Sequence, residues 1–171
     1  MGNNIATPIT VLGIGNILMR DDGLGIRALE ALRRDFSFPG NVTLIDGGTT
    51  IFHNMEIFTA AEKMIVFDAV KLDGPPGTVY AFNSDEYRVK LPRKATSHDV
   101  GVLNTLSIME LVGKKPPEVI IIGVQPKEYD TWSEELTPEV AAAIPEMVRR
   151  AVEQLAKWGM NIMQNKGKFA L

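Results

Sequence analysis

Residues 11–25 read VLGIGNILMRDDGLG, an apolar run that leads directly into a Gly-x-Gly turn. This pattern is typical of a buried strand that turns into a helix, as in nucleotide-binding folds. Two neighbouring acids, Asp21 and Asp22, follow the turn. The glycines therefore indicate a ligand site, but carboxylates at this position disfavour a phosphate as its ligand.

The composition describes an ordinary globular protein. A length of 171 residues suits one domain, and 45% of the residues are hydrophobic and 23% charged. The formal net charge is −3 and the sequence shows no basic stripe, so nucleic acid is not an expected partner. Cysteine is absent, which excludes disulfides, thiolate metal sites and a cysteine nucleophile.

The termini and the hydropathy indicate a cytoplasmic protein with no membrane partner. No apolar run approaches the roughly 18–20 residues that a membrane span requires. The start, MGNNIATP, has neither the basic nor the apolar region of a signal peptide. We expect a core over about residues 9–158, flexible tails at 1–7 and 160–171, and a monomer, because the charge is low and no apolar stripe is left uncovered.

Short apolar runs alternate with helical patterns along the whole chain. This alternation predicts one α/β domain, residues 1–171, with a mostly parallel sheet covered by helices on both faces. The predicted strands span residues 8–14, 42–46, 63–70, 78–82 and 118–124. The predicted helices span residues 23–34, 51–61, 102–112 and 137–158, with Asp22 as N-cap of the first.

Several polar residues are predicted at the rim where such a sheet binds ligands, beyond the C-terminal ends of its strands. They are Asp21, Asp22, Asp46, Asp68 and His98. Asp68 ends a strongly apolar run, where a carboxylate is costly unless it is paired or metal-bound. Carboxylates and an imidazole on one rim make a divalent-metal site with an open position, suited to Zn, Ni, Mn or Co.

Each candidate also has a purely structural explanation. The role of Asp22 could be simply that of a helix cap, and Asp46 could simply bond the Gly-Gly turn that follows it. His98 follows Ser97 and can be a solvated loop residue. The other histidine, His53, is expected on a helix surface, although it can also line the cleft.

Other nucleotide and hydrolase motifs fit poorly. The dinucleotide fingerprint needs a third glycine, and Gly25 comes too late to supply it. Asp46 does occupy the place of a ribose-binding acid, so a nucleotide-binding domain stays open as an alternative. The sequence contains no Walker lysine motif, no Gly-x-Ser-x-Gly elbow and no His-Glu-x-x-His.

Five pieces occur together in a specific order: residues 13–25, Asp46-Gly-Gly48, Asp68-Ala69, Ser97-His98 with Gly101, and residues 122–126 (IGVQP). This set resembles the [NiFe]-hydrogenase maturation endopeptidases over about residues 9–153. The resemblance implies a three-layer α/β/α domain with a twisted, about five-stranded sheet. It also implies a peptidase that removes the C-terminal extension of a hydrogenase large-subunit precursor after nickel insertion.

The resemblance also assigns roles to particular residues. The metal-contacting and catalytic positions of such enzymes correspond to Asp22, Asp68 and His98, although many members carry Glu where this chain has Asp22. The metal would be the nickel of the precursor, for which Zn or Cd could substitute in the isolated protein. Asp22 or Asp46 is then the candidate general base.

Two further questions stay open at the level of sequence. A non-catalytic metal-sensing chaperone of the same precursor is the alternative function. The loop of residues 125–135, with Tyr129 and Trp132, is either a contact to the precursor or a plain surface loop.

Overall fold

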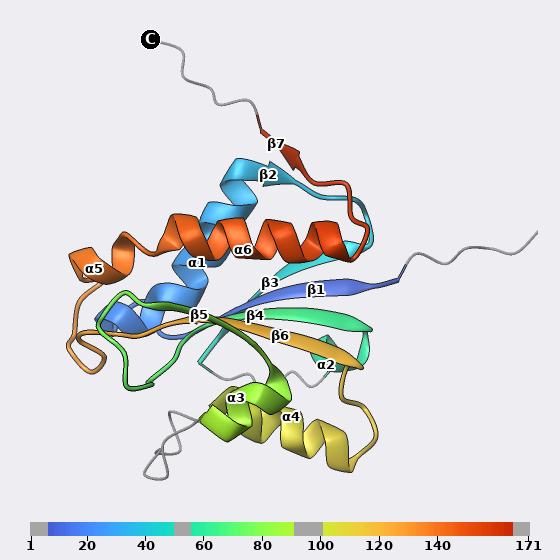
Figure 1. Ribbon diagram of the computed structural model, residues 1–171, viewed down its shortest axis with the longest axis horizontal. Coiled ribbons are helices and arrows are strands. Elements are labelled where there is room, and N and C mark those ends of the chain that lie inside the picture. The colour runs from blue at the N-terminus through green and yellow to red at the C-terminus, as the bar shows by residue number, and fades with distance from the viewer. Residues whose placement is uncertain (1–6, 50–55, 91–100, 166–171) are drawn as a thin grey trace, which may run out of the picture.

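The computed structural model describes residues 7–49, 56–90 and 101–165. Within them, a five-stranded sheet lies between two layers of helices (Figure 1). The strands are β1 (Ile9–Ile14), β3 (Val42–Gly48), β4 (Lys63–Ala69), β5 (Val79–Asn83) and β6 (Glu118–Val124). The helices are α1 (Leu24–Asp35), α2 (Glu56–Thr59), α3 (Ser84–Lys90), α4 (Gly101–Leu111), α5 (Pro138–Ala141) and α6 (Ile144–Lys157).

The sheet has the order β3-β1-β4-β6-β5. The first four of these strands are parallel to one another, and β5 pairs antiparallel with β6 at one edge. The predicted α/β fold with a mostly parallel, five-stranded sheet is therefore confirmed. In this order β1 and β4 are neighbours, so the chain segments that follow them leave the sheet side by side.

Helices cover both faces of the sheet, because alternate residues of each strand point to opposite sides. One core lies beneath α1 and α6 and includes Val11 and Phe67. The other lies against α3 and α4 and includes Leu12 and Val66 (Figure 1). The near-continuous apolar runs in the sequence are explained by this double burial.

The turn after β1 differs from the prediction. The chain first forms a 3₁₀ turn, η1 (Arg20–Gly23), and α1 begins only at Leu24 with Gly23 as its N-cap residue. Asp22 therefore does not cap α1, and that prediction is wrong. Its carboxylate instead accepts a hydrogen bond of 2.9 Å from the backbone N–H of Asn16.

Glycines allow this turn to pack directly on the sheet. Gly15 has a φ of +136°, and a Cβ there would lie 1.8 Å from the carbonyl oxygen of Asp22. A Cβ on Gly25 would lie 2.2 Å from the carbonyl oxygen of Ile14 and 2.3 Å from that of Phe67. Only glycine lets the end of β1, the start of α1 and the end of β4 meet at these distances.

The C-terminal part of the chain contains two further differences. The predicted helix over residues 137–158 is divided into α5 and α6. Pro145 explains the division, because its ring would clash with the carbonyl of the residue four positions earlier in a continuous helix. The tail is not wholly loose, because β7 (Met163–Gln164) pairs antiparallel with β2 (Phe36–Ser37).

Helix α3 was not predicted from the sequence, although its signal is present. The side chain of Asn83 accepts hydrogen bonds from the N–H groups of Asp85 and Glu86, and Glu86 accepts one from the N–H of Asn83. This reciprocal arrangement is a capping box. Of the predicted helix over residues 51–61, the structure describes only α2, and His53 lies outside the described residues.

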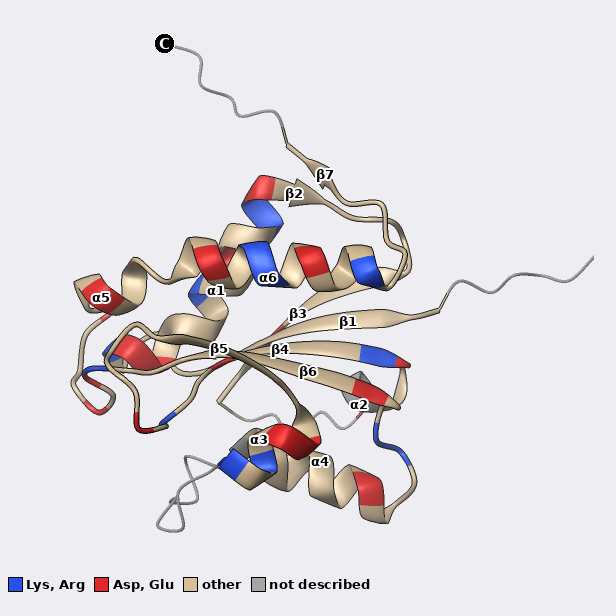
Figure 2. Ribbon diagram, in the orientation of Figure 1, with Lys and Arg blue, Asp and Glu red and all other residues tan. Residues whose placement is uncertain are grey.

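Charged residues of both signs are interspersed along the described elements, as α6 illustrates in Figure 2. The structure thus adds no basic stripe to the part of the chain that it describes. No helix in that part is both long and apolar enough to cross a bilayer.

Replacing Gly25 by Ala should destabilise the fold, because the added methyl would meet two backbone oxygens that cannot rotate away. We expect a loss of at least about 2 kcal/mol in the free energy of unfolding, measured by urea denaturation. Gly40→Ala is the matched control, since nothing lies within 4 Å of its Cβ position. Equal stabilities of the two variants would contradict this account of the turn.

Candidate active site at the ends of two parallel strands

Two of the predicted site residues, Asp22 and Asp68, lie at the same end of the sheet. Asp22 belongs to η1, the turn that follows β1. Asp68 is the next-to-last residue of the neighbouring strand β4. The two carboxyl groups interact, because the negative charge of Asp22 raises the pKa of Asp68. The predicted third residue, His98, lies outside the described residues.

Asp68 lies in an unusual electrostatic environment. Burial, and then the charge of Asp22, raise the pKa of its carboxyl from 3.8 to about 8, against an opposing backbone hydrogen bond from Ala69. Without a cation beside it, this carboxyl therefore keeps its proton at neutral pH. A bound cation would displace the proton and offset the repulsion between the two acids.

Asp21, the neighbour of Asp22, is fully buried and has a different role. Its carboxylate accepts hydrogen bonds of 2.9 Å from the backbone N–H groups of Lys127 and Glu128. It also accepts bonds from both the backbone N–H and the hydroxyl of Thr137, at 2.8–3.0 Å. Asp21 thus ties the turn after β1 to the loop after β6 and to the residue that precedes α5, which is a structural function.

Asp46 and Asp68 belong to opposite faces of the sheet. Its carboxylate accepts a hydrogen bond of 2.9 Å from the N–H of Gly48, so the expected bond to the Gly-Gly turn is confirmed. The preceding residues alternate, with Leu44 beside the core under α1 and Ile45 beside the core under α4. Asp46 therefore falls on the α1 face, whereas Asp68, two residues after Val66, falls on the α4 face.

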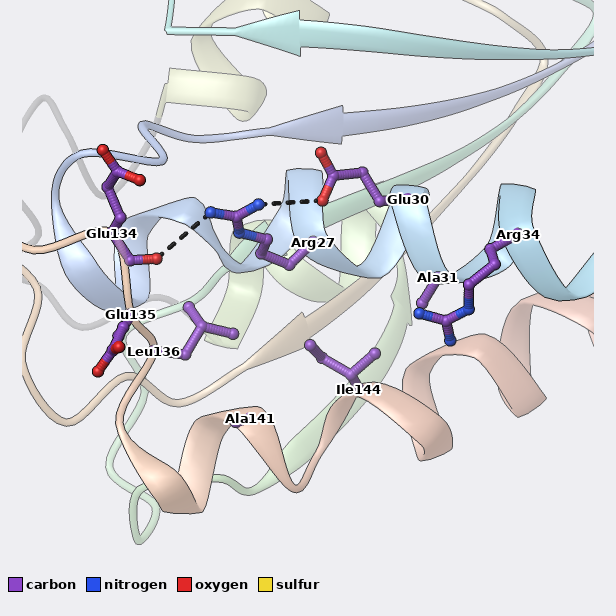
Figure 3. Close-up of a pocket in the computed structure, with 9 residues that line it drawn as sticks. All are labelled: Arg27, Glu30, Ala31, Arg34, Glu134, Glu135, Leu136, Ala141 and Ile144. Atoms are coloured by element: carbon purple, nitrogen blue, oxygen red, sulfur yellow. Dashed lines mark hydrogen bonds and ion pairs between the residues drawn. The ribbon is translucent and has the colours of Figure 1, made fainter. Parts of the chain in front are cut away.

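A groove between α1 and the α5–α6 segment is a separate feature (Figure 3). In it Arg27 already donates to the carboxylate of Glu30 at 3.2 Å and to the carbonyl of Glu134 at 3.3 Å. Leu136 and Ile144 provide its apolar wall. The groove lies on the α1 face and contains neither Asp22 nor Asp68, so it does not belong to the carboxylate site.

The described residues include two carboxylates that could contribute to a metal site. Asp22 and Asp68 offer carboxylate oxygens at one edge of the sheet, the donor type that divalent cations accept. Within the described ranges no three acidic, histidine or cysteine side chains are grouped closely enough to hold a metal ion by themselves. A third protein ligand would come from outside those ranges, where His53, His98 and Asp99 lie in the sequence.

Comparison with known proteins identifies the family. The family model HycI, hydrogenase maturation protease, matches residues 26–154. The chain belongs to the hydrogenase maturation protease family. It is accordingly an enzyme of the hydrolase class, a peptidase, and the resemblance noted in the sequence is confirmed.

Individual members of the family support this assignment. The hydrogenase expression/formation protein HupD of Bradyrhizobium diazoefficiens is 36% identical over 163 residues, which cover 95% of this chain and 85% of HupD. The hydrogenase 2 maturation protease of Escherichia coli K12 is 30% identical over 89% of this chain and 93% of its own. The structure of the E. coli hydrogenase maturating endopeptidase HybD has a TM-score of 0.85, with 29% identity, 93% coverage of this chain and 98% of HybD.

Asp68→Asn should make this protease more stable than the wild type at alkaline pH. The unfolded carboxyl titrates near 3.9, so between pH 4 and 8 the folded state holds a proton that the unfolded state releases. Wild-type stability therefore falls as the pH rises through this range, whereas asparagine does not ionise. At pH 9 we expect the variant to be roughly 2–4 kcal/mol more stable in metal-free buffer.

Urea unfolding at pH 5 and pH 9 with a chelator present measures this difference. Asp73→Asn, at an exposed carboxyl, is the control and should show no such gain. Parallel pH profiles for wild type and Asp68→Asn would refute the interpretation of Asp68.

Asp21→Asn should have the opposite effect on stability at neutral pH. The amide NH₂ would replace one of the two oxygens, both of which accept hydrogen bonds. The NH₂ would then face the backbone N–H groups that donate to that oxygen, in a buried place where neither donor has an acceptor. We expect a loss of about 3–5 kcal/mol, seen as a lower Tm in calorimetry, while Asp73→Asn stays near wild type. A Tm unchanged by Asp21→Asn would show that its hydrogen bonds do not hold the loop.

Proposed function

We propose that this protease removes the C-terminal extension of a [NiFe]-hydrogenase large-subunit precursor after nickel insertion, and that it recognises the bound nickel through Asp22, Asp68 and His98. The observation that carries the proposal is the pair of interacting carboxyl groups at the ends of β1 and β4, one of which has a pKa of about 8. Its protease relatives are named for hydrogenase formation and maturation.

The energetics of the carboxylate pair support a cation as its ligand. Burial and the neighbouring charge of Asp22 both disfavour the ionised form of Asp68, so its carboxyl retains its proton. A divalent cation would let both carboxyl groups ionise, because its positive charge would offset their repulsion. Nickel accepts both oxygen and imidazole ligands, and in this proposal it arrives as part of the substrate.

The position of α4 supports His98 as the third ligand. Helix α4 begins at Gly101, close behind His98 in the sequence, and packs on the face of the sheet to which Asp68 belongs. The helix that follows His98 in the sequence therefore belongs to the same face of the sheet as Asp68. An imidazole nitrogen with two carboxylates gives a three-ligand set with room for the substrate's own groups.

The chemistry follows from placing the scissile peptide beside the metal. Binding of the precursor's nickel would fix the nearby peptide bond at the rim, where metal polarisation of the carbonyl or activation of a water supplies the hydrolytic step. Of the two candidate general bases, Asp22 interacts with Asp68, whereas Asp46 bonds Gly48 on the other face. Asp22 is therefore the base that we favour, in a step in which its carboxylate is not bound to the metal.

Mass spectrometry of the precursor after incubation with the protein tests the proposal. Precursor with and without nickel is combined with wild type, Asp68→Asn, His98→Ala and the surface control Asp73→Asn. We expect loss of a C-terminal peptide only from nickel-loaded precursor, and only with wild type and the control.

The other outcomes separate the alternatives. Cleavage of nickel-free precursor at the same rate would refute nickel recognition while keeping the peptidase. Nickel-dependent complex formation without cleavage would replace the peptidase by a metal-sensing chaperone. Full activity of both Asp68→Asn and His98→Ala would refute the ligand set.

A further inference from the structure

Three large apolar side chains are exposed close to the carboxylate site. Ile17, Leu18 and Trp132 keep 40%, 36% and 75% of their surface exposed. We call these three residues the Trp132 patch. Exposed tryptophan beside exposed aliphatic residues is a composition typical of protein interfaces.

Backbone pairing brings the two parts of the patch together. Met19 and Ser133 form an isolated parallel bridge. The N–H of Ser133 donates to the carbonyl of Leu18 at 3.0 Å, and the N–H of Arg20 donates to the carbonyl of Ser133 at 2.7 Å. In a parallel bridge the residues one position earlier are also neighbours, so Leu18 lies beside Trp132.

The patch is continuous with the candidate active site. A Cβ on Gly23 would lie 2.8 Å from the Cα of Ile17, so the start of the patch packs directly on the residue after Asp22. Asn16, the residue before Ile17, donates its N–H to the Asp22 carboxylate. Ile17 and Leu18 therefore belong to the same turn as Asp22, so a macromolecule that places a metal against Asp22 binds beside them.

The loop that carries Trp132 is held in place before any partner binds. On one side the buried Asp21 accepts from Lys127 and Glu128, and on the other from Thr137. A surface that is already ordered loses little conformational entropy on binding, and a rigid tryptophan is a frequent energetic anchor. The Trp132 patch is therefore an ordered surface with an exposed anchor.

We propose that the Trp132 patch is the docking surface for the folded body of the metal-loaded precursor, an apolar protein surface that adjoins the nickel. This inference rests on the proposed function. The occupant is the precursor and not a second copy of this chain, because a copy seated on Ile17 and Leu18 would cover the approach to Asp22. The patch thus supplies affinity for the precursor, and the carboxylate pair binds its metal.

The molecule provides a matched control surface. Val89, Leu111 and Val112 are also exposed, at 85%, 88% and 53%, but they belong to the α3–α4 layer and its end. Leu111 ends α4 on the side where β6 begins, away from the C-terminal ends of the parallel strands (Figure 1). The substitution Leu111→Ser removes the same apolar side chain from the surface as Leu18→Ser does, but it leaves the Trp132 patch unchanged.

Cleavage kinetics on nickel-loaded precursor test the inference, with Trp132→Ser, Leu18→Ser, Trp132→Phe and the control Leu111→Ser. We expect Trp132→Ser to raise KM at least about tenfold and to leave kcat within about twofold. Trp132→Phe should restore much of the affinity, and Leu111→Ser should match wild type. Circular dichroism and Tm check that each variant is folded.

Several results would overturn the docking surface. One is an unchanged KM for Trp132→Ser. Another is a rise in KM for Leu111→Ser that equals the rise for Trp132→Ser. A third is a Trp132→Ser variant in which kcat falls and KM does not change. Self-association of wild type that is abolished by Trp132→Ser would assign the patch to a second copy instead. If wild type does not cleave, the proposed function fails, and direct binding of loaded precursor to wild type and Trp132→Ser then decides docking independently.

Discussion

The direct contact between three backbone segments, where only glycine fits, is the constraint on which the rest of the structure depends. At Gly25 the start of α1 lies against the carbonyl oxygens of Ile14 and Phe67, which end β1 and approach the end of β4. At Gly15 the turn folds back against Asp22. Because these contacts are between main-chain atoms, they fix where the 3₁₀ turn leaves the sheet, and so they bring Asp22 to Asp68.

This placement has an energetic cost that is consistent with a function. Burial first, and then the charge of Asp22, raise the pKa of Asp68, so an ionised carboxyl at this place destabilises the fold. The adjacent Asp21 shows how the same side chain is used when stability is the purpose, with donors from Lys127, Glu128 and Thr137 around it. Asp21 stabilises the loop, whereas Asp22, in the function that we propose, helps to bind a cation.

The loop after β6 links these two features to recognition. Asp21 accepts hydrogen bonds from the loop. The backbone of the loop also pairs with the turn after β1, through a bridge between Ser133 and Met19. As a result Trp132 stands beside the same turn that carries Asp22. In the function we propose, the precursor binds through two of its features, an apolar protein face and a metal. Both binding sites depend on the turn after β1.

The sequence by itself determined the strands, the parallel sheet with two covered faces, the rim on which the acids lie and the family resemblance, because these follow from local periodicity and ordered motifs. The family resemblance pointed to Asp22 and Asp68, but the residues did not show that Asp21 has a structural role, or that Asp46 and Asp68 belong to opposite faces of the sheet. Those differences depend on partners 106 to 116 residues away and on which face of the sheet each strand presents. Only the tertiary structure decided them, since a hydrogen bond between distant segments leaves no periodic signal in the chain.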